Sequence, residues 1–239
     1  MKVKKFSPLK AAKMSRLSSK VADRVLHQKI GIRRGEEKLE KISKIAAHIL
    51  RIIPFDEQKY GRSVAYGERF EQSISRKASK SLKNPKAIGR LHCVERCNTA
   101  LGLLRKAGIK AWLARQVYYD FSQKEYRIHD YVEFFHEGKV HTLAFGINFD
   151  TRKDYFAIYN FTAENILADS GLFGMPAMVK VLRGIDSSQI GGATDYNKLK
   201  RFLRNPFTVK ESMAEMKRLN LLVSSGVIPK QALEQIKNI

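Results

Sequence analysis

The chain has 239 residues, enough for one large domain or for a medium domain with helical additions. Hydrophobic residues make up 44% of it and charged residues 28%, which favours a packed core over wholesale disorder. No apolar run approaches the roughly 18 residues of a membrane span, and the basic N-terminus lacks the apolar block of a secretory signal. With two cysteines and no export signal, we expect a cytoplasmic protein without a transmembrane segment.

The net charge of +22 is concentrated in the first part of the chain. Residues 1–90 hold 24 Lys and Arg against 8 Asp and Glu, whereas residues 91–239 hold 21 against 15. Such a field attracts polyanions: nucleic acid, an anionic membrane face or an acidic protein. The alternative is a solvated basic helical surface without a partner, because charge alone does not define a function.

Helix formers with apolar residues at helical spacing occupy most of the first part of the chain. This pattern predicts helices over residues 8–28, 36–53, 63–82 and 93–107. Pro54 and Pro85 end the second and third of these runs, since proline cannot continue a helix. Gly108 follows the fourth run, at the position that glycine favours after a helix.

Strand formers dominate the middle of the chain. They predict strands over residues 110–119, 131–136, 139–145 and 154–161. The dipeptide Glu137-Gly138 is a two-residue hairpin signal that sets His136 opposite Lys139. The remaining sequence predicts a helix over 163–169, mostly loop over 171–192, and helices over 196–204, 209–224 and 229–237. Helices, then strands, then helices indicate an α+β fold.

Two cysteines lie one helical turn apart at the start of the fourth predicted helix. Helix neighbours at this spacing have Cβ atoms about 5–6 Å apart, too far for a disulfide. Cys97 shares a face with Leu101 and Leu104, which predicts a small buried hydrophobe. Cys93 lies at the helix start, where unpaired N–H groups and the helix dipole favour a thiolate and lower the thiol pKa.

A zinc site is an alternative role for these residues. His92, Cys93, Cys97 and His129 are all zinc-ligating types. Zinc sites, however, usually show tighter knuckles borne on loops. We therefore expect neither a metal nor another cofactor.

Two motifs stand out between residues 85 and 146. In the first, Cys93 opens a leucine-rich helix that ends in Arg105-Lys-Ala-Gly108-Ile109 and feeds a strand. In the second, a histidine at the head of a strand is followed by an apolar residue, a glutamate and an aromatic, here His129-Asp-Tyr-Val-Glu133-Phe-Phe135, and then by a Gly-Lys turn. In this order the two motifs resemble the core of the transglutaminase-like superfamily, which has a papain-like Cys–His site.

The resemblance implies a nucleophile helix packed on an antiparallel sheet. It covers neither the basic N-terminal region nor the tail. We therefore divide the chain into a basic helical region (1–84), a transglutaminase-like core (85–170) and a loop and helical C-terminal region (171–239).

For catalysis, the resemblance implies that the Cys93 thiolate attacks an amide carbonyl and that His129 exchanges protons with it. The resemblance therefore also implies a protein or peptide substrate, and it favours hydrolysis over transamidation. The family's third residue, an aspartate, falls at Ala144 here, and Asn148 or Asp150 could orient His129 instead. The alternative is an inactive transglutaminase-like module that binds nucleic acid or another anionic partner through residues 1–90.

Overall fold

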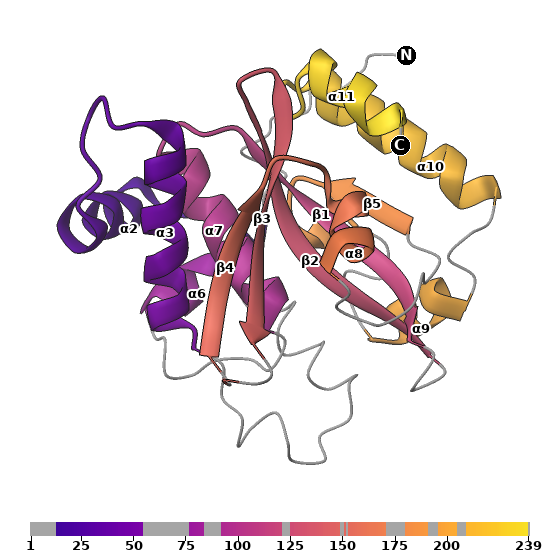
Figure 1. Ribbon diagram of the computed structural model, residues 1–239, viewed down its shortest axis with the longest axis horizontal. Helices are drawn as coiled ribbons and strands as arrows, with labels where there is room; N and C mark the ends of the chain where they lie inside the picture. The colour runs from indigo at the N-terminus through magenta and orange to yellow at the C-terminus, as the bar shows by residue number, and fades with distance from the viewer. Residues whose placement is uncertain are drawn as a thin grey trace.

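The computed structural model describes residues 13–54, 77–83, 92–120, 125–148, 151, 153–170, 180–190, 196–204 and 209–238. These residues form an α+β fold, as predicted: an antiparallel sheet in the order β4-β3-β2-β1-β5, with helices on both of its faces (Figure 1). Within the described ranges, no helix combines the length and the apolar character that crossing a membrane requires.

The sheet contains the four predicted strands and one that the sequence did not predict. The strands are β1 (Ala111–Asp120), β2 (Glu125–His136), β3 (Lys139–Asn148), β4 (Lys153–Tyr159) and β5 (Lys180–Gly184). The expectation of mostly loop over 171–192 is wrong where β5 forms and where a 3-10 turn, Ser187–Gln189, follows. β5 is a five-residue edge strand held against β1, so its local pattern is too short to predict it.

The β2–β3 hairpin has the expected turn. Glu137 and Gly138 adopt φ values of 47° and 76°, both in the left-handed region that two-residue hairpin turns require. His136 pairs with Lys139, as the sequence predicts. β2 is longer than predicted, however, so His129 lies within the strand and not at its head.

Helices of the N-terminal half cover one face of the sheet (Figure 1). They are α2 (Ser19–Asp23), which continues as the π-helix η1 (Arg24–Ile30), then α3 (Lys38–Ile52), α6 (Ala78–Lys83) and α7 (His92–Lys106). The prediction of a helix over 8–28 is wrong for residues 13–18, because Asp186 accepts hydrogen bonds from the backbone of Met14 and Ser15. Residues 8–12 and most of 63–82 lie outside the described residues.

The other face is covered by helices of the C-terminal half, which the sequence predicts as helices. These are α8 (Ala163–Ser170), α10 (Val209–Ser224) and α11 (Lys230–Lys237), while α9 (Tyr196–Arg204) lies near β2. Trp112 and Ile185 pack there against apolar residues of α10 and α11. On the α7 face, Leu101 and Leu104 pack against strand residues that include Leu113. The sheet is therefore the middle layer between two helical layers.

The sheet opens between β2 and β3. The β2–β3 ladder runs from His136 and Lys139 only as far as Val132 and Leu143. Beyond that point, β2 pairs with β1 and β3 pairs with β4, so the strands diverge (Figure 1). Extending the predicted hairpin register along β2 would set His129 opposite Gly146, but this extension is wrong: His129 pairs with Gln116 of β1, and Gly146 pairs with Tyr155 of β4. This opening receives the start of α7.

Candidate active site

The first turns of α7 connect the diverging strands on either side of the opening. Arg96 forms a 2.7 Å ion pair with Asp154 of β4 and donates two hydrogen bonds to the carbonyl of Ile53. One residue on, the Cys97 thiol donates to the backbone carbonyl of Asp130 on β2, with an Sγ–O distance of 3.2 Å. The helix start is therefore fixed against both halves of the sheet.

Cys97 is a buried structural residue, as the sequence predicts. Its side chain is fully buried, together with Leu101 and Leu104 on the same face of α7. Both cysteines are free thiols, which confirms the expectation that they form no disulfide.

Cys93 is partly exposed, and its thiol contacts the backbone of Asp130. Burial, reinforced by the negative charge of Asp130, raises the pKa of Cys93 to about 11. Hydrogen bonds from the backbone of Asp130 and Val94, together with the positive charge of Arg115, oppose this rise without cancelling it. The expectation of a lowered pKa is therefore wrong, because the helix start sits inside the sheet opening beside a carboxylate.

Asp130 is the centre of this arrangement. Its carboxylate accepts bonds of 2.7 and 2.8 Å from Arg115 of β1, and both side chains are fully buried. Its backbone bonds to the thiols of Cys93 and Cys97. The ion pair therefore places one buried carboxylate beside the cysteines at the start of α7.

His129 is partly exposed and lies beside Asp130 in the chain. A ring N–H donates to the backbone carbonyl of Phe145 on β3, so the imidazole reaches across the opening. The ring also packs at 4.6 Å from the ring of Tyr131. Burial lowers the pKa of His129, although the Asp130 charge and the Phe145 bond oppose the effect. The imidazole is consequently neutral near pH 7.

Asp130 of β2 is the common neighbour of Cys93 and His129. The thiol bonds to the backbone of Asp130, and the imidazole belongs to the preceding residue of the same strand. Among the described contacts, the two side chains are not hydrogen-bonded to each other. The geometry thus gives a partly exposed thiol and an anchored imidazole at one opening of the sheet.

None of the described candidates for a third catalytic group orients the histidine. Ala144 is buried with Tyr131 in the apolar cluster that contains residues of α8. Asn148 is exposed, and its side-chain oxygen accepts from the Thr151 N–H at 2.9 Å. Asp150 lies outside the described residues. The Phe145 carbonyl holds the imidazole instead, and a backbone acceptor leaves no signal in a sequence.

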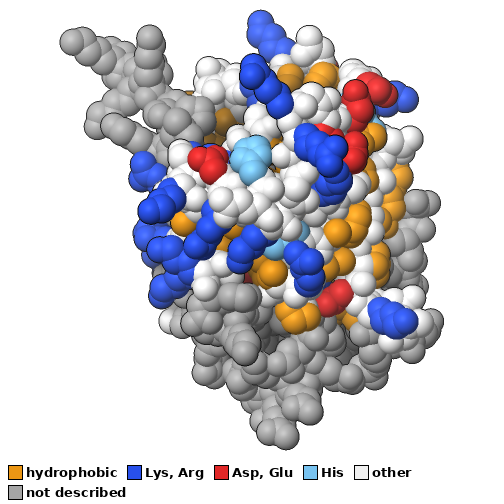
Figure 2. Space-filling model, turned by 90° about the vertical axis from the view of Figure 1, so that its left-hand side faces the viewer, with side chains coloured by type: hydrophobic (Ala, Val, Ile, Leu, Met, Phe, Trp, Pro, Cys, Tyr) orange, Lys and Arg blue, Asp and Glu red, His pale blue; other side chains and the backbone are white. Residues whose placement is uncertain are grey.

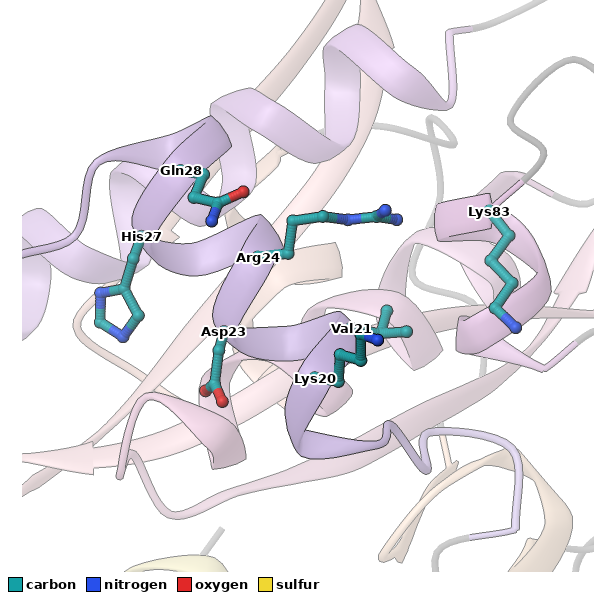
Figure 3. A pocket seen from close by; sticks show the side chains of 7 residues that line it. All are labelled: Lys20, Val21, Asp23, Arg24, His27, Gln28 and Lys83. Atoms are coloured by element: carbon teal, nitrogen blue, oxygen red, sulfur yellow. The ribbon is translucent and has the colours of Figure 1, made fainter.

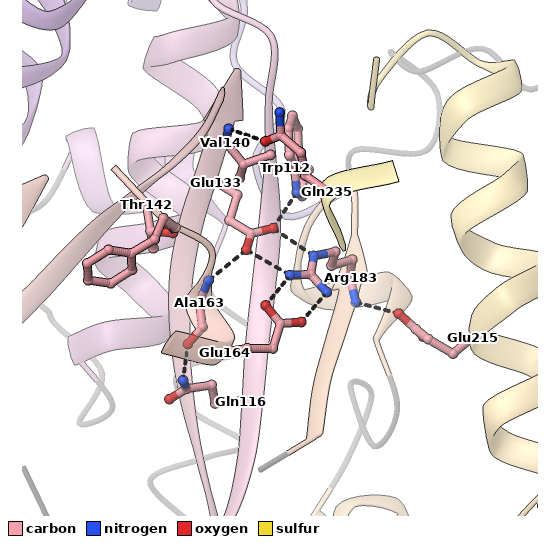
Figure 4. Close-up of polar contacts among 11 residues, drawn as sticks. Trp112, Gln116, Glu133, Val140, Thr142, Ala163, Glu164, Arg183, Glu215 and Gln235 are labelled. Carbon is pink, nitrogen blue, oxygen red and sulfur yellow. Dashed lines mark hydrogen bonds and ion pairs between the residues drawn. The ribbon is translucent and has the colours of Figure 1, made fainter. Parts of the chain in front are cut away.

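The motif glutamate, Glu133, organises the sheet face behind the site (Figure 4). Fully buried, it accepts from the Trp112 ring N–H at 2.7 Å and from the Ala163 N–H at 2.9 Å. Arg183 of β5 donates to Glu133 at 2.7 and 2.9 Å and to Glu164 of α8 at 2.7 Å. Sequence reasoning missed Arg183 because it placed that residue in a loop.

In the described part of the chain, His, Cys, Asp and Glu side chains form no group of three or more that could hold a metal ion. No family model matches the sequence, and no curated protein matches it either.

Proposed function

We propose that Cys93 and His129 act as nucleophile and base on an amide or peptide bond, with hydrolysis favoured over transfer. One observation carries the proposal. The partly exposed Cys93 thiol bonds to the backbone of Asp130, while the ring of the adjacent His129 is anchored to the Phe145 carbonyl. These two contacts, made at neighbouring residues of β2, support the pairing of a thiol with a base that the two sequence motifs imply.

The protonation states favour general-base catalysis over a preformed thiolate–imidazolium pair. With its pKa near 11, Cys93 is a neutral thiol at pH 7, and the lowered pKa of His129 leaves the imidazole neutral. Because one ring nitrogen donates its proton to Phe145, the other has a lone pair to accept a proton. His129 is therefore suited to the role of base.

The reaction then proceeds in two balanced steps. The Cys93 sulfur bonds to the carbonyl carbon as its proton passes to His129, and the proton moves on to the leaving amine as the C–N bond breaks. Water then attacks the thioester carbon and gives one proton to His129. The C–S bond breaks and His129 returns that proton to the sulfur, which releases the acid and the free thiol. An amine in place of water would give transamidation.

The test compares iodoacetamide alkylation of the wild type with that of His129→Ala across pH. We expect alkylation at pH 7.5 to be at least about tenfold faster in the wild type, because the base takes the thiol proton. The rate should fall as pH drops below the histidine pKa, which lies under its usual 6.5. Cys97→Ala is the matched control, and it should keep the labelling of Cys93.

Catalysis is tested with a peptide mixture followed by mass spectrometry, with and without added methylamine. Cleaved peptides indicate hydrolysis, and methylamide products indicate transfer; Cys93→Ser should lose about 100-fold or more of either product. A thiol that is equally reactive in His129→Ala, with no product from any peptide, would overturn the proposal and favour an inactive core.

A further inference from the structure

A hollow of about 630 Å³ lies between the α2–η1 segment and α6. Its lining is mainly basic or polar: Lys20, Val21, Asp23, Arg24, His27, Gln28 and Lys83. Figure 3 shows Arg24 extending from η1 towards α6, which carries Lys83 on the other side. Cations therefore enter the hollow from two separate elements. This site lies apart from Cys93 and His129, which are absent from its lining.

The three cations of the hollow have no acidic partners among the described residues. No described carboxylate forms an ion pair with Lys20, Arg24 or Lys83. Asp23, the one acidic residue in the lining, points away from Arg24 and Lys83 (Figure 3). Like charges that converge repel one another, and the described residues supply no counter-charge here, so a bound anion would stabilise this arrangement.

The positive charge continues over the surrounding face (Figure 2). The described residues 13–54 and 77–83 contain fourteen Lys and Arg but four Asp and Glu. Two of those four, Glu36 and Glu40, are already paired with Lys44. A ligand with many negative charges could therefore contact the hollow and the face around it at once.

The composition of this face favours nucleic acid over a membrane. A membrane-binding surface adds apolar anchors to its basic residues, but the large exposed hydrophobic side chains of the described chain, Met213, Met216 and Leu221, all belong to α10. The described residues 13–54 and 77–83 also contain no Phe, Tyr or Trp to stack on bases. Contacts would thus be made to phosphates and would not read the sequence.

We propose that this basic hollow binds the phosphodiester backbone of nucleic acid without sequence preference. Lys20 and Arg24 contact phosphates from one wall and Lys83 contacts them from the other. The proposal is independent of the Cys93 chemistry, so a Cys93→Ala variant should bind as the wild type does.

The test measures binding of the full chain to a fluorescein-labelled DNA duplex of mixed sequence by fluorescence anisotropy over a salt series. The variant is Lys20→Gln/Arg24→Gln/Lys83→Gln. We expect its affinity at ~0.1 M salt to fall at least ~10-fold, and the slope of log K against log salt to become less steep by about 2–3, since each phosphate contact contributes ~0.9.

The matched control, Lys139→Gln/Lys217→Gln/Lys237→Gln, removes the same net charge from exposed positions on β3, α10 and α11, none of which lines the hollow. Its affinity should stay within ~2-fold of the wild type. Equal losses in the two variants would assign binding to net charge alone and overturn the proposal. A chain that does not bind the duplex would also overturn the proposal. This holds even if the chain binds vesicles containing phosphatidylserine, because the ligand would then be a membrane.

Discussion

The two faces of the sheet bury charge in different ways. On the face covered by α8 and α10, Arg183 bridges Glu133 and Glu164 in one connected network. On the α7 face, Arg115 and Asp130 form a bidentate ion pair among apolar residues and cysteines. The first network joins three elements of the fold, whereas the second pair lies directly beside the candidate nucleophile.

Because of this difference, mutations on the two faces should have different effects, on folding stability at one face and also on the Cys93 thiol at the other. In a connected network, the loss of one member leaves several buried charges without partners, so the effect falls on folding. In an ion pair next to a thiol, the same kind of change also alters the charge that the thiol experiences. We therefore expect changes near Glu133 to act on stability alone, and changes at Asp130 to act on Cys93 as well.

The largest expected effect is that of Arg183→Met. The variant leaves Glu133 and Glu164 without their shared cation, and we expect the free energy of unfolding to fall by about 3–5 kcal/mol in urea titrations. Arg218→Met is the control, because this partly exposed residue pairs with Glu215 at the edge of the network, and its loss should cost about 0–1 kcal/mol. Similar losses in both variants would contradict a central role for Arg183.

The network of Glu133, Arg183 and Glu164 also predicts that the free energy of unfolding depends on pH. Burial would raise the pKa of Glu164, but the positive charge of Arg183 and the hydrogen bonds to the carboxylate together outweigh burial and lower it. A carboxylate with a lowered folded-state pKa contributes stability that is fully present above its unfolded value, near 4.5, and is lost as pH falls through the folded value. Urea titrations below pH 4.5 should show this loss in the wild type, and Glu164→Gln should reduce it.

Asp130→Asn tests the effect of the buried ion pair on the α7 face of the sheet. It removes the negative charge that, after burial, most raises the Cys93 pKa, and it leaves Arg115 to lower that pKa further. We expect the pKa of Cys93 to drop below about 11 and alkylation to begin at lower pH, at a cost of about 2–3 kcal/mol in stability. Glu133→Gln is the comparison, since it should destabilise the fold without moving the alkylation profile.

Local features of this fold were predictable from the sequence, and features set by distant contacts were not. Gly108, with φ of 80°, ends α7, and Glu137-Gly138 makes the hairpin, because each depends on a few adjacent residues. Burial of Cys97 followed from the helical spacing of its apolar neighbours. The raised pKa of Cys93, in contrast, depends on burial by other elements and on the charge of Asp130, which lies on β2. The edge strand that carries Arg183 likewise depends on pairing with β1.

Gly102→Ala tests how tightly the N-terminal segment is held against the α7 face. A Cβ at Gly102 would lie 2.5 Å from the backbone oxygen of Ser15 and 3.0 Å from the Leu17 side chain. We expect the segment to be displaced, at a cost of about 1–3 kcal/mol, with faster amide hydrogen exchange at Met14 and Ser15. Gly226→Ala is a control without steric contact: its φ of 70° costs about 1 kcal/mol, and exchange at Met14 should not change.

The smallest expected effect is that of Asn148→Ala, which tests the orienting role of the Phe145 carbonyl. The Asn148 side chain accepts from Thr151 in a surface turn, so its removal should cost about 0.5–1 kcal/mol. Because the Phe145 carbonyl already fixes the imidazole of His129, the alkylation rate of Cys93 should stay within about twofold of the wild type. A loss of about tenfold or more at unchanged stability would mean that Asn148 turns towards His129 during the reaction, and the backbone carbonyl would then be a resting contact and not the orienting group.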